Sequence, residues 1–213
     1  MQIYKANYTI ITGFIGISII LYGIISSYTE YIGCSGQQYN FLNHFVSELG
    51  QYECSPKANT FNISLIFGTL FLIIYYFNII PESSKKIKIL FRWIISIIGC
   101  SAISIAIFSM DNIFIHVISA LVFFYVCFFA SLLFNIYSLF MSHKYVPKYF
   151  IISGILISVT TLLNIIQFHQ LEFNMLNTLK NRPDILFICI IEWTSLLSML
   201  LFFISSIIFF IRR

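Results

Sequence analysis

Five side chains suited to proton or metal chemistry stand out in this chain, three of them at the ends of long apolar stretches and two in the longest connection. They are His44, Ser47, Asp111, His116 and Glu192. Ionisable groups are costly inside apolar segments, which makes them candidates for function. His116 with Asp111 or Glu192 would form a general acid–base pair, suited to hydrolysis or group transfer at a lipid headgroup. Ser47 could act as a nucleophile only if a base approaches it, which the sequence leaves open.

Metal or cofactor binding by these residues has weaker support. A metal ion needs three or four ligands in one sphere, and His44, His116, Asp111 and Glu192 could in principle supply them. No two histidines have the spacing that places two ligands on one helix face, so we expect no metal. Haem would need two facing axial ligands, and we expect no cofactor. The structural alternative is that Asp111 caps a helix while His116 and Glu192 bond neighbouring helices.

The five cysteines fall into two groups. Three lie in apolar stretches, whereas Cys34 and Cys54 lie in the longest connection, Tyr28–Thr60. If that connection faces an oxidising compartment, a Cys34–Cys54 disulfide would close a loop of about 20 residues and contribute about 3 kcal/mol. Two unpaired thiols are the alternative. The Cys-x-x-Cys motif of thiol oxidoreductases is missing from the sequence.

The composition indicates a membrane protein. Of 213 residues, 59% are hydrophobic and 9% are charged, whereas soluble domains carry about 25% charged residues. The 12 Lys and Arg with 8 Asp and Glu cannot cover a soluble fold of this length, so lipid must solvate much of its surface. The net charge of +4 therefore reports orientation, and we expect no nucleic-acid partner.

Six apolar blocks are long enough to cross a bilayer as helices, which takes about 20 residues each. The blocks are Tyr8–Ser27, Phe61–Ile80, Ile89–Ser109, Ile113–Phe140, Tyr149–Phe168 and Ile185–Ile211. Because they are continuous rather than alternating, we expect an all-α bundle of six transmembrane helices, a single domain over residues 1–213. The first block is too long for a signal-peptide core and is expected to stay as an uncleaved span. The joint Met110–Asn112 is short enough to make spans three and four adjacent antiparallel neighbours.

Basic residues predict the orientation of the bundle. With the N-terminus inside, nine of the 12 basic residues lie on the inner side: Lys5, Lys85, Lys86, Lys88, Arg92, Lys144, Lys148, Arg212 and Arg213. The outer side holds the other three, Lys57, Lys180 and Arg182. The positive-inside rule requires this bias. We therefore expect both termini in the cytoplasm and the five candidate side chains near the non-cytoplasmic surface.

Within the first outer loop, Asn40–Leu49 has the periodicity of a short amphipathic helix. The apolar face would consist of Phe41, Leu42, Phe45, Val46 and Leu49. Gly50 follows as a C-terminal cap. The opposite face would present Ser47 and the pair His44 and Glu48, which are four residues apart and can meet. Such a helix would lie in the headgroup zone or cover the bundle.

The segment Asn43–Phe61, NHFVSELGQYECSPKANTF, resembles the signature of six-span membrane proteins grouped as domain-of-unknown-function family 998. The positions that match its Ser-x-Leu-Gly element and the Pro and Phe-Asn that follow are Ser47, Leu49, Gly50, Pro56, Ala58, Phe61 and Asn62. Asp111 with His116 at the third joint and Glu192 in the last span are also similar to that family. Trp193 departs from it, because the family more often has Arg there.

The resemblance implies a six-span fold and a lipid-related context, and it implies no established activity. The family is distantly similar to the DRAM/Sfk group of eukaryotic six-span proteins, which are linked to lipid organisation, membrane trafficking and autophagy.

The leading hypothesis is an integral membrane protein that binds or organises a lipid or other amphiphile at a polar pocket near the outer surface. Membrane lipids would be its partners, with other membrane proteins as further partners. One alternative is a membrane-embedded lipid-modifying hydrolase or transferase that uses His116 with Asp111 or Glu192. Another is a small transporter or accessory subunit, although the internal repeat common in carriers is not found. We expect the plasma membrane of a bacterium or archaeon, with a eukaryotic endomembrane as the alternative.

Overall fold

The computed structural model describes residues 2–80, 85–140, 146–171 and 182–212. Lys144, Lys180 and Arg213, which contribute to the predicted orientation, lie outside these residues, as does the side chain of Lys5. Within the described part the chain is all helical and contains no strand.

Six long helices confirm the six predicted spans. They are α1 (Gln2–Thr29), α2 (Ala58–Ile79), α3 (Lys85–Ile107), α4 (Ile113–Phe140), α5 (Lys148–Leu171) and α7 (Phe187–Ile211). Each helix includes a segment apolar and long enough to cross a bilayer. The chain is therefore a multi-pass membrane protein.

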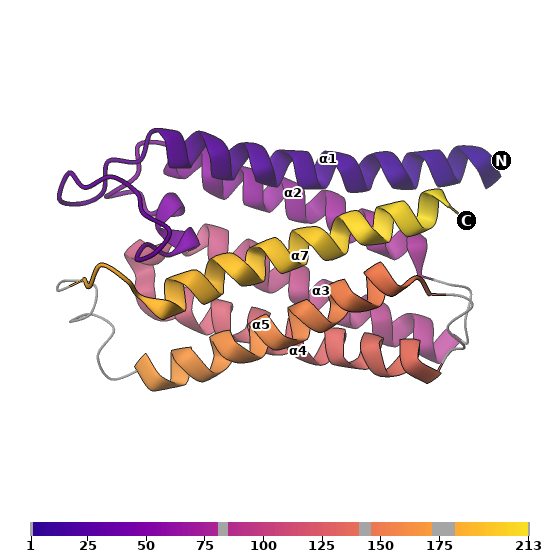
Figure 1. The fold of residues 1–213 in the computed structure, drawn as a ribbon. Coiled ribbons are helices and arrows are strands. Elements are labelled where there is room, and N and C mark those ends of the chain that lie inside the picture. Colours follow the sequence, from indigo (N-terminus) through magenta and orange to yellow (C-terminus); the bar gives the residue numbers. More distant parts are fainter. Residues whose placement is uncertain (1, 81–84, 141–145, 172–181, 213) are drawn as a thin grey trace.

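The six helices form a ring in chain order (Figure 1). Each packs against its neighbours in the chain, and α7 closes the ring by packing against both α5 and α1. The 3-10 helix η2 (Met110–Asn112) joins α3 and α4, which are neighbours as predicted. Both termini lie at one end of the ring (Figure 1), as an even number of spans requires. The side of the membrane that this end faces stays a prediction.

The pair α1 and α2 packs closely through glycines. A Cβ atom at Gly68 would lie 2.9 Å from the carbonyl oxygen of Gly16, and a Cβ atom at Gly16 would lie 2.9 Å from that of Gly68. Small residues of this kind let transmembrane helices approach until their backbones touch. The two helices therefore form a tight wall of the ring, and the loop that joins them lies at the end away from the termini (Figure 1).

The prediction of one amphipathic helix over Asn40–Leu49 is wrong, because the segment has a different secondary structure. Turns are followed by a short 3-10 helix, η1 (Val46–Gly50), whose residues are all buried. It contacts α1, α2, α7 and η2, so it lies in the end of the ring away from the termini, which we call the loop end (Figure 1). Phe41 and Leu42, assigned to the apolar face, are exposed. The helical periodicity of Asn40–Leu49 did not predict this structure because residues of its predicted polar face are also buried, where they form hydrogen bonds.

Candidate functional site

A cavity of about 120 Å³ lies inside the ring and is bounded at the loop end by η1. Its walls come from α1, α2, α3, α4 and α7, and most of the side chains that line it are apolar. The polar side chains that line it are Ser47 from η1, His116 from α4 and Glu192 from α7. The structure thus brings three of the five candidate residues together in one site.

Glu192 is held near the start of α7, where its carboxylate binds η1. Its Oε2 accepts a hydrogen bond of 2.9 Å from the backbone amide of Val46. The hydroxyl and backbone amide of Ser47 also interact with this carboxylate. Among the described residues, the donors to this carboxylate are the neutral groups of Val46 and Ser47, and the lining includes no Lys or Arg.

His116 lies near the start of α4 and is buried. Its Nδ1 is 2.8 Å from the carbonyl oxygen of Phe108. A carbonyl can only accept, so Nδ1 carries the hydrogen in this bond, and Nε2 of the neutral ring is an acceptor. The α3–α4 joint therefore fixes the imidazole, whose ring also interacts with the backbone of Ile105.

Ser47 is not activated as a nucleophile in this structure. Its hydroxyl is 3.3 Å from the thioether sulfur of Met110 and also interacts with the Glu192 carboxylate, and no contact with His116 is formed among the described residues. A thioether is a weak acceptor and not a base. The nucleophile hypothesis for Ser47 would require the side chain to turn toward His116, and it stays a prediction.

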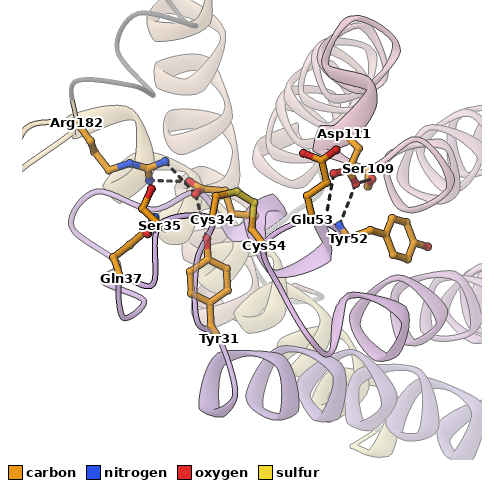
Figure 2. The surroundings of a disulfide bond; sticks show 11 residues. Tyr31, Cys34, Ser35, Gln37, Tyr52, Glu53, Cys54, Ser109, Asp111 and Arg182 are labelled. Carbon is orange, nitrogen blue, oxygen red and sulfur yellow. Dashed lines mark hydrogen bonds and ion pairs between the residues drawn. A yellow bond between two sulfur atoms is a disulfide. The ribbon is translucent and has the colours of Figure 1, made fainter.

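Asp111 points to the first outer loop instead of the cavity. Its carboxylate accepts from the backbone amides of Tyr52 at 2.9 Å and Glu53 at 3.4 Å, and the hydroxyl of Ser109 also donates to it (Figure 2). Charge-assisted bonds to backbone amides are strong positioning contacts. The geometry therefore gives Asp111 the role of an anchor for the loop.

His44 is buried in the first outer loop, away from the residues that line the cavity. Its Nδ1 is 2.8 Å from Oδ1 of Asn43, and its ring lies against Tyr31 and Tyr39. Burial lowers the pKa of His44, although the nearby Glu48 opposes this shift. Nε2 is buried and has no hydrogen-bond partner among the described residues. The predicted His44–Glu48 pair is not formed.

Glu48 instead forms an ion pair with Arg182 that the sequence reasoning missed. The guanidinium Nη1 and Nη2 donate to Oε1 at 2.9 Å and Oε2 at 3.0 Å (Figure 2). The amide of Phe45 and the hydroxyl of Tyr31 donate to the same carboxylate. Burial would lower the pKa of Arg182, but the bonds to Glu48 raise it above the usual value.

A signal for this pair was present in the sequence. Arg182 is the only Arg on the predicted outer side, and it was used only to assign orientation. Arg is preferred over Lys where a planar group meets a carboxylate with two parallel bonds. Arg182 lies just before the last span, on the same predicted side as the loop that carries Glu48. It could therefore have been proposed as the partner of Glu48.

The predicted disulfide between Cys34 and Cys54 is confirmed (Figure 2). It closes the first outer loop over a separation of 20 residues. The disulfide joins two parts of this loop, and the contacts of Asp111 and Arg182 attach the loop to other parts of the chain. The loop that carries η1 is therefore held in one arrangement over the cavity.

The four residues considered as metal ligands are divided among different places. His116 and Glu192 line the cavity, Asp111 binds the outer loop, and His44 is buried within that loop. In residues 2–80, 85–140, 146–171 and 182–212, no three His, Cys, Asp or Glu side chains come together in a way that could hold a metal ion.

A family model described as "Protein of unknown function (DUF998)" matches residues 25–205, which include η1 and every residue of the cavity except Ile20 and Ile24. The chain belongs to the DUF998 family. No curated protein and no solved structure matches it. DUF998 membership therefore assigns no activity, and the six-span architecture rests on the helices themselves.

The DUF998-like signature in this chain forms the seat of η1 on α2. Asn62 donates a hydrogen bond of 2.8 Å from Nδ2 to the carbonyl of Gly50. A Cβ atom at Gly50 would collide with the side chains of Asn62 and Phe61. Leu49 is fully buried beside them. These residues position η1, and through it Ser47, at the roof of the cavity.

Trp193, the residue after Glu192, also binds the first outer loop. Its Nε1 donates to the hydroxyl of Tyr39 at 3.1 Å, and its ring meets Tyr39 and Phe41 edge to face. The hydroxyl of Tyr39 in turn donates to the carbonyl of Phe45. Position 193 therefore supplies an aromatic anchor for the loop and no counter-charge for Glu192.

Proposed function

We propose that this DUF998 protein binds an amphiphile in the cavity beneath η1, with the polar end of the ligand at His116 and Glu192. The observation that supports the proposal is the combination of His116, Glu192 and Ser47 in a cavity whose other walls are apolar. Ligand sites are commonly apolar with a few polar groups that fix orientation.

The size of the cavity limits how much of the ligand it takes up. A volume of about 120 Å³ is smaller than the 300–1,000 Å³ or so of sites that enclose a drug-sized molecule. The ligand would therefore place a headgroup or short segment inside the ring and leave the rest outside it. The predicted orientation puts this site in the outer half of the bilayer, and the DRAM/Sfk resemblance supports a lipid-related role.

The test is mass spectrometry of small molecules that copurify with the protein, compared with a His116→Ala variant. We expect a ligand that is present with the wild type and depleted in the variant. Phe114→Ala is the matched control, because Phe114 lies half a turn away on α4 and is 73% exposed. An unchanged ligand profile in a folded His116→Ala protein would overturn the proposal.

A second candidate function is hydrolysis or group transfer on the bound amphiphile. It is favoured by one observation, that Ser47 and His116 line the same cavity. His116 would act with Asp111 or Glu192, because Asp111 interacts electrostatically with the imidazole and Glu192 lines the same cavity. Incubation with a phospholipid mixture, followed by mass spectrometry, would show new products with the wild type and none with Ser47→Ala. A protein that only binds would give no products in either case.

A further inference from the structure

The cavity contains one acidic side chain and no Lys or Arg beside it. The acidic side chain is that of Glu192. The guanidinium of Arg182 is not part of the lining; it is paired with Glu48 and also donates to the carbonyl of Asn43. An ionised carboxylate within the bilayer is costly unless it has a counter-ion. A ligand can supply the counter-ion that the cavity lacks.

The aromatic side chains that line the cavity suit a ligand with a cationic group. Phe61, Phe123 and Phe124 all line the cavity and come from two sides of it, α2 and α4. The faces of aromatic rings attract cations, and rings arranged around a pocket recognise alkylammonium groups in particular. His116 adds an acceptor nitrogen, Nε2, that can take a hydrogen bond from an N–H or O–H group of a ligand.

We propose that the cavity takes an alkylammonium group, either the headgroup of an amine-bearing lipid or a free small organic cation. This inference rests on the proposed function and names the chemistry of the polar end of the ligand. Glu192 is the counter-ion, the phenylalanine rings surround the alkyl groups, and His116 and Ser47 accept or donate hydrogen bonds to neighbouring polar atoms.

The size and charge of the cavity exclude other headgroups. An apolar cavity of about 150 Å³ holds a benzene molecule, so one of about 120 Å³ accommodates a methylated or primary ammonium group but not a sugar. A phosphate or carboxylate would lie against Glu192 without a lining Lys or Arg to balance it. Like charges at such a site are mutually unfavourable.

The test is calorimetric titration of the whole protein, in phosphatidylglycerol nanodiscs, with tetramethylammonium and with choline. We expect saturable binding of both. Glu192→Gln keeps an oxygen that can accept from Val46 but removes the charge, so affinity should fall about 30-fold or more. Glu53→Gln removes an exposed acid at the same end of the ring and should leave affinity unchanged.

Two further measurements keep the inference testable if Glu192→Gln does not fold. Phe123→Leu preserves apolar volume and should weaken choline binding about threefold, because it removes one ring face. The uncharged isostere of choline, 3,3-dimethylbutan-1-ol, should bind much more weakly than choline to the wild type. Equal binding of choline and the isostere would overturn the inference.

Native mass spectrometry separates the two sources of the group. Retention of phosphatidylcholine or phosphatidylethanolamine over phosphatidylglycerol, with displacement by choline, identifies a lipid headgroup. Choline binding without selective lipid retention identifies a free cation, and either result supports the inference. If neither cation nor amine lipid binds, the inference is wrong, while the proposed function is judged separately from the ligand lost in His116→Ala.

Discussion

Carboxylates at the loop end bind mostly to backbone amides of the first outer loop. Asp111 binds the amides of Tyr52 and Glu53, and Glu192 binds that of Val46. These acids come from η2 and α7, so two separate elements hold one loop in place. The concentration of acidic residues at this end is thus explained largely by loop attachment, and Glu192 alone among them also lines the cavity.

Removal of one partner of the Glu48–Arg182 pair should be strongly destabilising. Both side chains are largely buried, at 4% and 17% exposed. Arg182→Gln should lower the free energy of unfolding by about 3–5 kcal/mol, because Glu48 is left buried without its cation. The double variant Arg182→Gln with Glu48→Gln should lose less stability than Arg182→Gln alone. Thermal unfolding in detergent measures the stability of the two variants, and equal losses of stability would contradict the account.

The exposed pair Glu30–Lys57 is the matched control for that experiment. Its side chains are 54% and 39% exposed, with the charged atoms 3.4 Å apart. Lys57→Gln should change the free energy of unfolding by about 0.5 kcal/mol or less, because solvent screens such pairs.

Acid should destabilise the protein through His44. Burial lowers its pKa in the folded chain, so below pH about 6.5 the unfolded chain takes up a proton that the folded chain does not. The groups around it are Glu48, Arg182 and the rings of Tyr31 and Tyr39. The unfolding temperature should therefore fall from pH 7 to pH 5, and His44→Gln should reduce that fall. An identical fall in both proteins would contradict this role.

The sequence identified the important residue types but not their partners. His116 and Glu192 were singled out by their position in apolar stretches and Ser47 by its place on the polar face of the loop segment, and the structure places them in one cavity. Asp111 and His44 lie at the same end of the bundle, but their side chains do not line the cavity. Side-chain direction at a helix end depends on the path of the loop that covers it, and no periodicity in the sequence records that path.

At the scale of elements, long apolar runs were predictable and the short η1 was not. The six helices follow from length and composition, because the backbone must satisfy its own hydrogen bonds in lipid. η1 has only five residues, and its buried Glu48 is stable there only because Arg182 meets it from another part of the chain. Tertiary contacts of this kind override local helical periodicity.

Loss of the Cys34–Cys54 disulfide should loosen the first outer loop without disrupting the ring. The double variant Cys34→Ser with Cys54→Ser should lose about 3 kcal/mol of stability through the freed chain entropy of the loop. Limited proteolysis should then cut within residues 30–57 faster, while far-UV circular dichroism stays unchanged. Equal cleavage rates in the two proteins would show that the disulfide does not hold the loop.

Gly50→Ala should displace η1 from α2. The added Cβ atom meets the side chains of Asn62 and Phe61, neither of which can move without losing its own contacts. Overpacking at such a site costs about 1–3 kcal/mol. A lower unfolding temperature is expected, and Asn62→Ala combined with Gly50→Ala should recover part of the loss. A fully stable Gly50→Ala protein would contradict this packing.

At the scale of the whole molecule, a ring of six helices is closed at one end by a loop that is attached at several points. The predicted orientation places this end on the non-cytoplasmic side. A membrane-impermeant thiol reagent should label Gln38→Cys in intact cells and label Lys86→Cys only after permeabilisation, since both positions are exposed at opposite ends. The unsubstituted protein is the control, because its three free cysteines lie in helices. Labelling of Lys86→Cys in intact cells would invert the orientation.

The central claim is that the cavity beneath η1 is the ligand site, and filling it is the most direct test. Ala120 is buried in α4 and lines the cavity. Native mass spectrometry of Ala120→Leu should show loss of the mass of the bound ligand seen with the wild type, in a protein whose elution volume and circular dichroism are unchanged. Retention of the same ligand mass in folded Ala120→Leu would contradict the account.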